Sequence, residues 1–453
     1  MECTNKKYNT EEIFSNLVTN AKNANVIPAE KFESYRVKRG LREMDGTGVV
    51  AGVTNIGNAH GYIVYEGEKL ADEGKLEYRG LNMTSLIEGF TSENRFGFEE
   101  CIYLLLFGKL PTKSELDGFC ALLDEKRRLP AGFTEDVIMK APSPSIMNKM
   151  ATSVLALYAY DENPDDTSLE NTLRQSIDII AKLPVIAANS YRVYRTYFHG
   201  KSLNIHTPKA GLSSAENFLR ISRSTKTFTE EEARLLDLCM VIQAEHGGGN
   251  NSTFACRVLS SSGTDTYSAI AAGIGSLKGP LHGGANIKVQ QMFDTIRPMI
   301  TDVNDDDQIK AVLVKILGGE IGDGKIYGMG HAIYTKSDPR AIMLKKYAHD
   351  LAVKKGYGDD FKLLESIERI TPDVFREFKG IDKEMCANVD LYSGLVYRML
   401  DIPPEMYTPL FAIARVSGWC SHRIEETQTA KRIIRPAYKC IATPIDYIPL
   451  DQR

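Results

Sequence analysis

Hydrophobic side chains along this chain of 453 residues recur mainly with the three- to four-residue spacing of an α-helix. The spacing is helical from about residue 84 onward, and Thr112-Lys-Ser-Glu115 and Thr229-Glu-Glu-Glu232 both match the capping box that begins a helix. Residues 233–242 are apolar on nearly every side, which predicts a helix buried within a large bundle. The pattern therefore predicts a mainly α protein.

The N-terminal part of the chain follows a different pattern. Residues 11–35 are expected to be helical with one polar side, and the character changes from about residue 40 to residue 75. Residues 48–54 and 61–65 are short apolar runs punctuated by glycine, which favours β-strands. We expect a small β-sheet near the N-terminal region.

Length, charge and cysteine spacing narrow the classes of function. A chain of this length can form two or more domains, and its 55 basic and 59 acidic residues nearly cancel, so we expect no nucleic-acid partner. The eight cysteines form no C-x-x-C pair, which is typical of reduced thiols. The N-terminus lacks an apolar signal segment, and no apolar stretch is long enough to span a bilayer. We therefore expect a cytoplasmic protein with no membrane partner.

Two histidines and one aspartate occupy positions beside glycines or at the expected start of a helix. His282 lies between Pro280 and two glycines, before a helix expected to restart near Ala285, and His331 follows a glycine turn. Asp390 precedes an expected helix, where it could act as an N-cap or present a carboxylate to a cleft as a base. Together these three side chains suit proton abstraction next to a carbonyl group.

Arginines near these segments are candidates for binding a carboxylate. Arg340 follows Asp338-Pro339 and offers a planar fork of donors, although in isolation a surface ion pair is the first explanation for it. Arg415 lies in an apolar helix, where an unpaired charge would be costly, so it needs an anion. Arg435, near the C-terminus, is by itself most simply a surface residue or an arm contact.

Other motifs are incomplete. His246 precedes three glycines, as in the oxyanion strand of esterases, but the chain has no G-x-S-x-G motif. Residues 319–325 match a phosphate loop up to Lys325, but Ile326 replaces the Ser or Thr that would bind Mg²⁺. A zinc site of His246, His282 and His331 is a weaker alternative, because no H-E-x-x-H spacing occurs. Five histidines are given no role: His60, His199, His206, His349 and His422.

Five motifs in a fixed order carry a resemblance to a known family. The chain resembles the citrate synthase family over most of its length beyond residue 40, including Tyr78-Arg-Gly80. The motifs are Glu245-His-Gly-Gly-Gly-Asn-Asn-Ser-Thr253, Gly279-Pro-Leu-His-Gly-Gly-Ala-Asn286, Gly330-His-Ala-Ile-Tyr-Thr-Lys-Ser-Asp-Pro-Arg340, Asn388-Val-Asp-Leu-Tyr-Ser-Gly394 and Ala412-Ile-Ala-Arg-Val-Ser-Gly-Trp419.

The resemblance implies a mostly helical homodimer with a two-domain citrate synthase-like fold. The large domain would be discontinuous, comprising residues 1–281 and 397–453, and a small domain of residues 282–396 would close over the active site. The implied reaction is an acyl transfer of the tricarboxylic acid cycle, in which acetyl-CoA condenses with oxaloacetate and water to give citrate and CoA. No metal or other cofactor is expected, because coenzyme A enters as part of a substrate.

The resemblance also implies the roles of individual residues. Asp390 would remove the methyl proton, His282 would donate a hydrogen bond to the thioester oxygen, and His331 would polarise and protonate the ketone oxygen. A further set would bind oxaloacetate, the last of them in the neighbouring subunit's site: His246, Arg340, Arg415 and Arg435.

The sequence departs from many family members at three positions. Thr335 replaces a basic residue expected to meet a CoA phosphate, Gln243 replaces a histidine, and Ala437 replaces a second basic residue after Arg435. The residues that bind CoA are therefore not assigned. A 2-methylcitrate synthase using propionyl-CoA is the alternative function, because the same three catalytic residues would serve both reactions. A non-catalytic CoA or dicarboxylate sensor is the alternative from another class.

Overall fold

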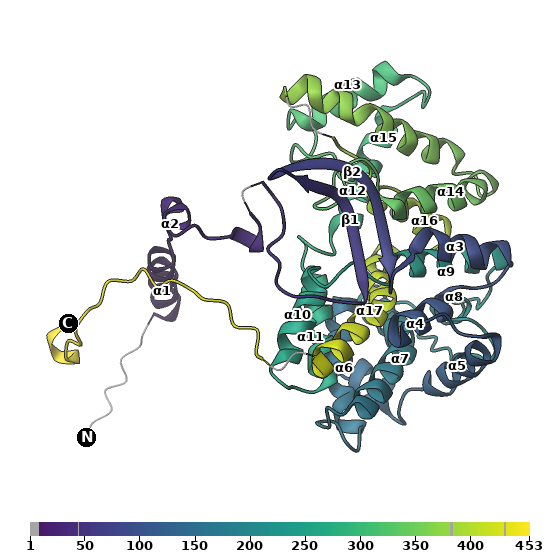
Figure 1. The fold of residues 1–453 in the computed structure, drawn as a ribbon, viewed down its shortest axis with the longest axis horizontal. Coiled ribbons are helices and arrows are strands. Elements are labelled where there is room, and N and C mark those ends of the chain that lie inside the picture. Colours follow the sequence, from purple (N-terminus) through teal and green to yellow (C-terminus); the bar gives the residue numbers. More distant parts are fainter. Residues whose placement is uncertain (1–8, 44, 381–383, 430–431) are drawn as a thin grey trace. The chain divides into compact units, whose positions relative to one another are not determined.

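A computed structural model describes residues 9–43, 45–380, 384–429 and 432–453. The described residues separate into two compact units, one formed by residues 9–43, 45–50 and 435–453 and the other by residues 51–380, 384–429 and 432–434. Figure 1 shows the ribbon with its labelled elements. The division into domains at residues 282 and 396 is a different division and stays a prediction.

The described part of the first unit contains two α-helices, α1 (Thr10–Ala24) and α2 (Ala29–Ser34). The predicted helical segment of residues 11–35 is therefore confirmed, with a break before Pro28, whose ring cannot continue a helix. The side chain of Asn9 accepts a hydrogen bond from the Glu12 amide and caps α1. None of the residues of α1 is buried within the described chain.

A three-stranded antiparallel sheet begins the second unit. Strands β1 (Gly57–Tyr65) and β2 (Glu68–Tyr78) form a hairpin, and the short β3 (Leu81–Asn82) pairs with the end of β2. The predicted sheet is present, but the strand expected at residues 48–54 is wrong. Val50 and Val53 are exposed there, and the pairing is limited to an isolated bridge between Gly48 and Arg42, beside which the Val49 amide donates to the Leu41 carbonyl, so the rest of the segment has no neighbouring strand.

The remainder of the second unit is helical, as predicted. The helices are α3 (Met83–Ser92), α4 (Phe98–Phe107), α5 (Lys113–Lys126), α6 (Ile146–Leu157), α7 (Leu169–His199), α8 (Ser214–Ser222), α9 (Glu230–Gln243), α10 (Asn251–Ser261), α11 (Thr266–Lys278), α12 (Ala285–Ile296), α13 (Asp306–Leu317), α14 (Pro339–Lys354), α15 (Gly358–Lys379), α16 (Val389–Met399) and α17 (Tyr407–Thr429). Both predicted capping boxes are present, at Thr112 before α5 and at Thr229 before α9.

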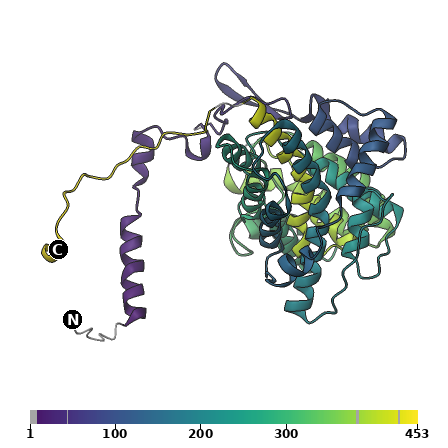
Figure 2. The same ribbon diagram turned by 90° about the horizontal axis from the view of Figure 1, so that it is seen from below.

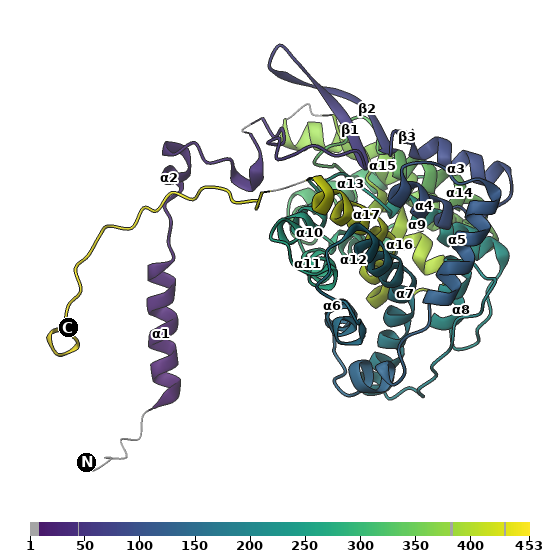
Figure 3. The same ribbon diagram turned by 60° about the horizontal axis from the view of Figure 1, so that its bottom comes forward.

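Two groups of helices form within this unit. The buried helix α17 packs against α4, α7, α9, α10 and α11. Figure 3 labels this helix, in yellow, among the other helices of the unit, and Figure 2 shows the same yellow helix from another side. The second group comprises α12 to α16, in which α16 contacts α12, α14 and α15, and α13 contacts α15. Helix α14 also packs on α9, so α9 lies where the two groups meet. The predicted site residues come from this region.

Candidate active site

Helix α9 delivers His246 to the site. The helix is buried along most of its length, and after its last residue, Gln243, the chain turns through Gly247 at a φ of 84°, a conformation that favours glycine. His246 is 5% exposed, and its Nε2 atom has no hydrogen-bond partner. Burial, then the charges of Arg340 and other site residues, lowers the pKa of His246 well below its ordinary value. The ring is therefore neutral at pH 7.

The loop that carries His331 is joined to the start of α16 by backbone hydrogen bonds. The Gly330 amide donates to the Cys386 carbonyl over 2.7 Å, and the Asn388 amide donates to the Gly328 carbonyl over 2.9 Å. The Asn388 side chain also donates to the Gly330 carbonyl over 2.8 Å. These bonds bring His331 and Asp390, which lie far apart in the sequence, to the same place.

The structure decides which residue caps α16. The side-chain oxygen of Asn388 accepts the Asp390 amide over 3.0 Å, so Asn388 is the N-cap and Asp390 is the second residue of the helix. The N-cap interpretation of Asp390 is therefore wrong, and its carboxylate is not used in capping. The sequence misled because aspartate and asparagine are both common caps, and only the backbone shows which one precedes the first helical residue.

The Asp390 carboxylate has a perturbed pKa. Burial raises its pKa to about 6; the nearby Asp338 carboxylate adds to this rise, whereas the Arg340 charge and a hydrogen bond from Asn286 oppose it. A carboxylate with a pKa close to physiological pH is suited to act as a general base, because it is ionised and still accepts a proton readily.

His282 lies in the turn between α11 and α12, and α12 begins at Ala285 as predicted. Its Nε2 atom is 3.1 Å from Ser252 Oγ, which accepts a hydrogen bond from Trp419 Nε1 over 3.1 Å. Burial, assisted by the charge of Arg415, lowers the pKa of His282 to about 4. A neutral imidazole at this position can donate a hydrogen bond to an oxygen without carrying a charge.

The tautomer of His331 follows from its backbone contacts. Its Nδ1 atom accepts the amides of Ile333 and Tyr334 over 3.1 and 3.2 Å, so a neutral ring carries its proton on Nε2. That Nε2 atom is 3.4 Å from Nη2 of Arg340. Both groups are hydrogen-bond donors, and donors side by side suit an oxygen atom that accepts from both.

The two buried arginines differ in their partners. Arg340 is held by Asp338, with Nη2 to Oδ2 at 2.7 Å and Nε to Oδ1 at 3.0 Å. Burial lowers the pKa of Arg340, but the charge and hydrogen bond of Asp338, together with Tyr334 and Asp390, raise it overall. Arg415 is 0% exposed, its Nε donates to the Gln243 carbonyl over 2.6 Å, and neither Nη1 nor Nη2 has a partner. Burial lowers the pKa of Arg415 to about 10. A buried, unpaired guanidinium fits an anionic ligand.

Tyr334 belongs to the site, although the sequence analysis assigned it no role. Its ring stacks on His331 at 4.8 Å between centroids and meets the edge of His246 at 5.6 Å. Arg340 lies 5.4 Å from the centre of the Tyr334 ring, whose hydroxyl is buried without a hydrogen-bond partner. The signal in the sequence was its position within the motif between His331 and Arg340, where an aromatic side chain with a polar tip can face the same ligand.

The structure thus brings together six of the seven predicted site residues: His246, His282, His331, Arg340, Asp390 and Arg415. Arg435 lies in the other unit and is exposed within the described chain, so its contact with a neighbouring site stays a prediction. Neutral imidazole donors, a carboxylate with a raised pKa and two buried guanidinium groups can bind a dicarboxylate and move a proton at carbon.

The Thr335 side chain is hydrogen-bonded to the β-hairpin. Its hydroxyl donates to the Gly61 carbonyl of β1 and accepts the Asp72 amide of β2 over 3.1 Å. The hydroxyl is therefore committed to the hairpin. The residues that contact a CoA phosphate stay unassigned.

Two further findings concern the described residues as a whole. No group of three or more His, Cys, Asp or Glu residues among them is arranged to hold a metal ion. None of the helices in the described part of the chain is long and apolar enough to cross a membrane.

Comparison with known proteins connects this geometry to a family. A family model described as citrate synthase, C-terminal domain, matches residues 44–437. The citrate synthase of Deinococcus radiodurans is 37% identical over 367 residues, which is 80% of this chain and 89% of that protein. The citrate synthase of Synechocystis sp. is 33% identical over 390 residues, 84% of this chain and 89% of that protein.

Solved structures give the same result. The ternary complex of citrate synthase from Thermoplasma acidophilum with carboxymethyl coenzyme A and oxaloacetate has a TM-score of 0.75 at 26% identity, and covers 92% of this chain and 99% of that chain. Citrate synthase from Pyrobaculum aerophilum has a TM-score of 0.72 at 31% identity, with 89% of this chain and 93% of that chain covered.

Proposed function

The chain belongs to the citrate synthase family and is an acyltransferase of that family, and we propose that the residues described above carry out its reaction. Acetyl-CoA supplies a methyl carbon, oxaloacetate supplies a ketone carbon, and water releases citrate and CoA. The assignment of roles depends on one observation: Asp390, a carboxylate of raised pKa, lies in the same site as two imidazoles and two buried arginines.

Oxaloacetate is the substrate that the buried donors suit. It carries two carboxylates and a ketone oxygen, and Arg415 offers two nitrogens without a partner in a fully buried position. Arg340, His246 and Tyr334 offer further polar groups beside it. We assign the carboxylates to the two arginines and the Tyr334 hydroxyl, because charge-assisted hydrogen bonds to a buried guanidinium are strong.

Acetyl-CoA is activated by removal of a proton from its methyl group. The ionised Asp390 takes this proton, and the electron pair of the broken C–H bond moves towards the thioester oxygen, which His282 stabilises with a hydrogen bond. The Ser252 hydroxyl lies between Nε2 of His282 and Oδ1 of Asn250, and it donates its hydrogen to Nε2, so that the neutral ring carries its hydrogen on Nδ1, which faces the thioester oxygen. Because the pKa of His282 is lowered to about 4, the donor is a neutral imidazole.

Condensation follows when the methyl-derived carbon of this enolate attacks the ketone carbon of oxaloacetate, and its electron pair forms the new carbon–carbon bond. The ketone oxygen gains negative charge, and the Nε2 proton of His331 is transferred to it, which gives the hydroxyl group of citryl-CoA. Water then adds to the thioester carbonyl and CoA leaves as the thiol. No step requires a metal ion, since imidazole and guanidinium donors supply the charge stabilisation.

The assay is the release of free CoA thiol on mixing acetyl-CoA with oxaloacetate. We expect thiol release that depends on both substrates, and an Asp390→Asn variant slowed by roughly 10²- to 10⁴-fold. Binding of both substrates without thiol release would favour the sensor alternative. Propionyl-CoA is expected to be the poorer substrate, and equal or faster turnover of propionyl-CoA would instead indicate a 2-methylcitrate synthase.

A cytoplasmic homodimer remains part of the proposal, with Arg435 completing the neighbouring site. The test is to combine Arg435→Ala and Asp390→Asn subunits, each of which is expected to have low activity alone. In a mixed dimer one site would contain both defects and the other neither, so activity should return to roughly half of the wild-type value. No gain in activity would show that Arg435 acts within its own subunit.

A further inference from the structure

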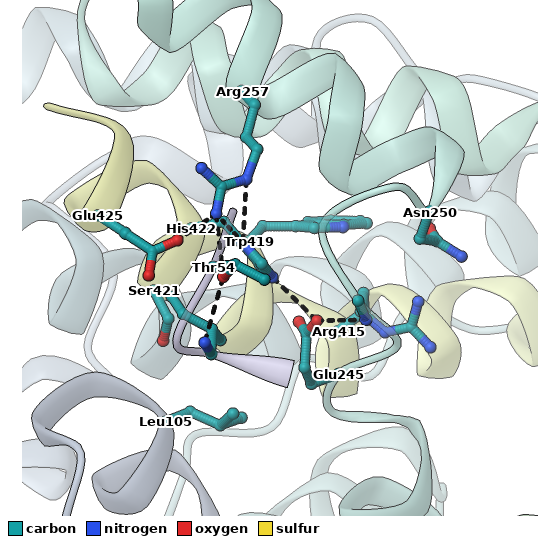
Figure 4. A network of polar contacts seen from close by, with 12 residues as sticks. Thr54, Leu105, Glu245, Asn250, Arg257, Arg415, Trp419, Ser421, His422 and Glu425 are labelled. Carbon is teal, nitrogen blue, oxygen red and sulfur yellow. Dashed lines mark hydrogen bonds and ion pairs between the residues drawn. The ribbon is translucent and has the colours of Figure 1, made fainter. Parts of the chain in front are cut away.

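A buried polar network lies directly behind His246 and Arg415. It contains Arg257 of α10, His422 of α17 and Glu245, which immediately precedes His246 (Figure 4). His422 and Glu245 are 0% exposed and Arg257 is 8% exposed. The sequence analysis gave His422 no role, and none of the proposed chemical steps uses these three side chains. Buried charged groups of this kind are costly unless they are fully paired.

Arg257 fixes the tautomer of His422. Nδ1 of His422 lies 2.6 Å from Nη2 and 3.1 Å from Nε of Arg257. Arginine stays protonated and can only donate, so Nδ1 must be the acceptor and carries no hydrogen. The neutral ring then has its proton on Nε2, which donates to Glu245 Oε1 over 2.9 Å. Arg257 itself is anchored by Glu425, by Glu426 at 2.6 Å and by Thr54 at 3.2 Å.

A backbone amide and two neighbouring glycines fix the position of the Glu245 carboxylate. Its Oε1 also accepts the Gly247 amide over 2.5 Å, which closes the turn around His246. A Cβ atom on Gly57 would lie 2.6 Å from Glu245 Cγ, and one on Gly418 would lie 2.2 Å from Oε2, so both neighbouring segments need glycine to admit the side chain. Burial raises the pKa of Glu245, but contact with His422 and the charge of Arg415 lower it overall.

The carboxylate acts on two substrate-binding groups at once. Through Gly247 it holds the backbone turn that presents His246, and through space its charge raises the pKa of Arg415 against the effect of burial. Arg415 interacts through space with six titratable or charged groups: Tyr78, Glu245, His246, His282, Tyr334 and Arg340. The first two and Tyr334 raise the pKa of Arg415, whereas Arg340 lowers it. Of these, Glu245 has the largest effect on Arg415 after burial itself.

We propose that His422 and Glu245 are positioning residues for oxaloacetate: Arg257 holds His422 in one tautomer, and His422 holds the ionised Glu245 that fixes the turn of His246 and balances the charge of Arg415. The proposal rests on the proposed function for the identity of the substrate. It assigns no proton transfer to the network, because its groups lie behind the residues that face the substrate rather than among them.

The first experiment compares His422→Asn with His422→Gln. The shorter asparagine amide cannot reach both Arg257 and Glu245, whereas glutamine can accept from one and donate to the other. Oxaloacetate affinity, measured by titration calorimetry, is expected to weaken roughly 10- to 100-fold in His422→Asn, because a displaced binding group is costly, and to recover in large part in His422→Gln. The KM for oxaloacetate should follow this affinity, while kcat at saturating oxaloacetate should change less than threefold.

Arg423→Gln is the matched control for a purely structural effect. Arg423 is adjacent in α17 and 0% exposed, but it donates to the Thr264 carbonyl, outside the network. This variant should lower Tm and leave oxaloacetate affinity within about twofold. If His422→Asn behaved in the same way, with lower Tm and unchanged affinity, the positioning role would be refuted.

Glu245→Gln tests the proposal independently if the His422 variants fail to fold. Glutamine keeps an oxygen for the Gly247 amide but removes the charge, so Arg415 should lose its proton more easily. The alkaline loss of oxaloacetate binding should then move to lower pH by roughly one unit, whereas an unshifted profile would overturn the role of Glu245 as counter-charge. Failure of wild-type protein to release CoA would contradict the proposed function; the affinity comparison among these variants would still decide the positioning role.

Discussion

Removal of the amide that stabilises ionised Asp390 is a sharp test of the proposed base. Asn286 lies in the first turn of α12, and the two hydrogens of its Nδ2 serve the Asp390 carboxylate and Ser393 Oγ. The hydrogen bond to Asp390 stabilises the carboxylate and therefore lowers its pKa. An Asn286→Ala variant loses this bond, so the pKa of Asp390 should rise.

The expected size of the effect follows from the value of one hydrogen bond. A hydrogen bond to a charged group contributes about 1.5–3 kcal/mol, and one pKa unit corresponds to about 1.4 kcal/mol. The pKa of Asp390 should therefore rise from about 6 by roughly one to two units. A base works only when it is ionised, and at pH 7 the ionised fraction should fall from about nine-tenths to between about one-half and one-tenth.

The assay is kcat/KM for acetyl-CoA at saturating oxaloacetate, measured from about pH 5 to pH 9. The acid limb of the profile should move to higher pH in Asn286→Ala, and the variant should approach the wild-type rate near pH 9. Ser393→Ala is the control, because it removes the other partner of Asn286 and should leave the acid limb in place. A profile lowered equally at every pH would refute the assignment of Asp390 as the base controlled by Asn286.

Three further changes test separate parts of the site. Tyr334→Phe removes a buried hydroxyl that has no partner within the protein. The variant should raise the KM for oxaloacetate roughly five- to tenfold and have little effect on the KM for acetyl-CoA. Equal effects on both KM values would contradict the assignment of Tyr334 to oxaloacetate. Gly74→Ala would place a Cβ atom 2.1 Å from the Ser337 carbonyl oxygen and should lower kcat by displacing the loop between His331 and Arg340. Gly118→Ala in α5, which meets nothing within 4 Å, should keep full activity; comparable loss in both variants would remove the loop from the explanation. Extensive chelation should leave CoA release intact, and a loss restored by zinc would favour the metalloenzyme alternative.

Local signals predicted the helices well because they depend on neighbouring residues. The capping boxes at Thr112 and Thr229 and the restart of α12 at Ala285 are all present, since each is decided within one or two turns of chain. The strand expected at residues 48–54 failed for a non-local reason. An apolar run becomes a strand only when another segment pairs with it, and β1 pairs instead with β2.

The site was predicted less completely, because its supporting residues have no local signature. His422 is a single histidine inside a helix, and its importance comes from Arg257, 165 residues away in sequence. A weak clue was present: Arg415, Trp419, His422 and Glu426 recur at three- to four-residue spacing along α17, which places polar groups on one face of a buried helix. Tyr334, in contrast, lies inside a recognised motif. It was given no role because the neighbouring His331 and Arg340 accounted for that motif without it.

The β-hairpin connects two sets of site residues that otherwise have separate supports. His331, Arg340 and Asp390 are linked through Asp338, whose carboxylate binds Arg340 and accepts the Val389 amide over 3.3 Å. The other set, His246 and Arg415, is supported by Glu245 and by the carbonyl of Gln243.

Strand β1 touches both sets through glycines. A Cβ atom on Gly57 would lie 2.6 Å from Glu245 Cγ, and one on Gly61 would lie 2.6 Å from Cα of Tyr334. These two glycines are four residues apart in one strand, which pairs with β2 on both sides of a register shift between His60 and Tyr62. The strand therefore sets the spacing between the turn of His246 and the loop of His331. If the two sets of residues move apart, the hairpin either moves with one of them or loses the hydrogen bonds of Thr335. The hairpin therefore couples the position of the turn of His246 to the position of the loop of His331.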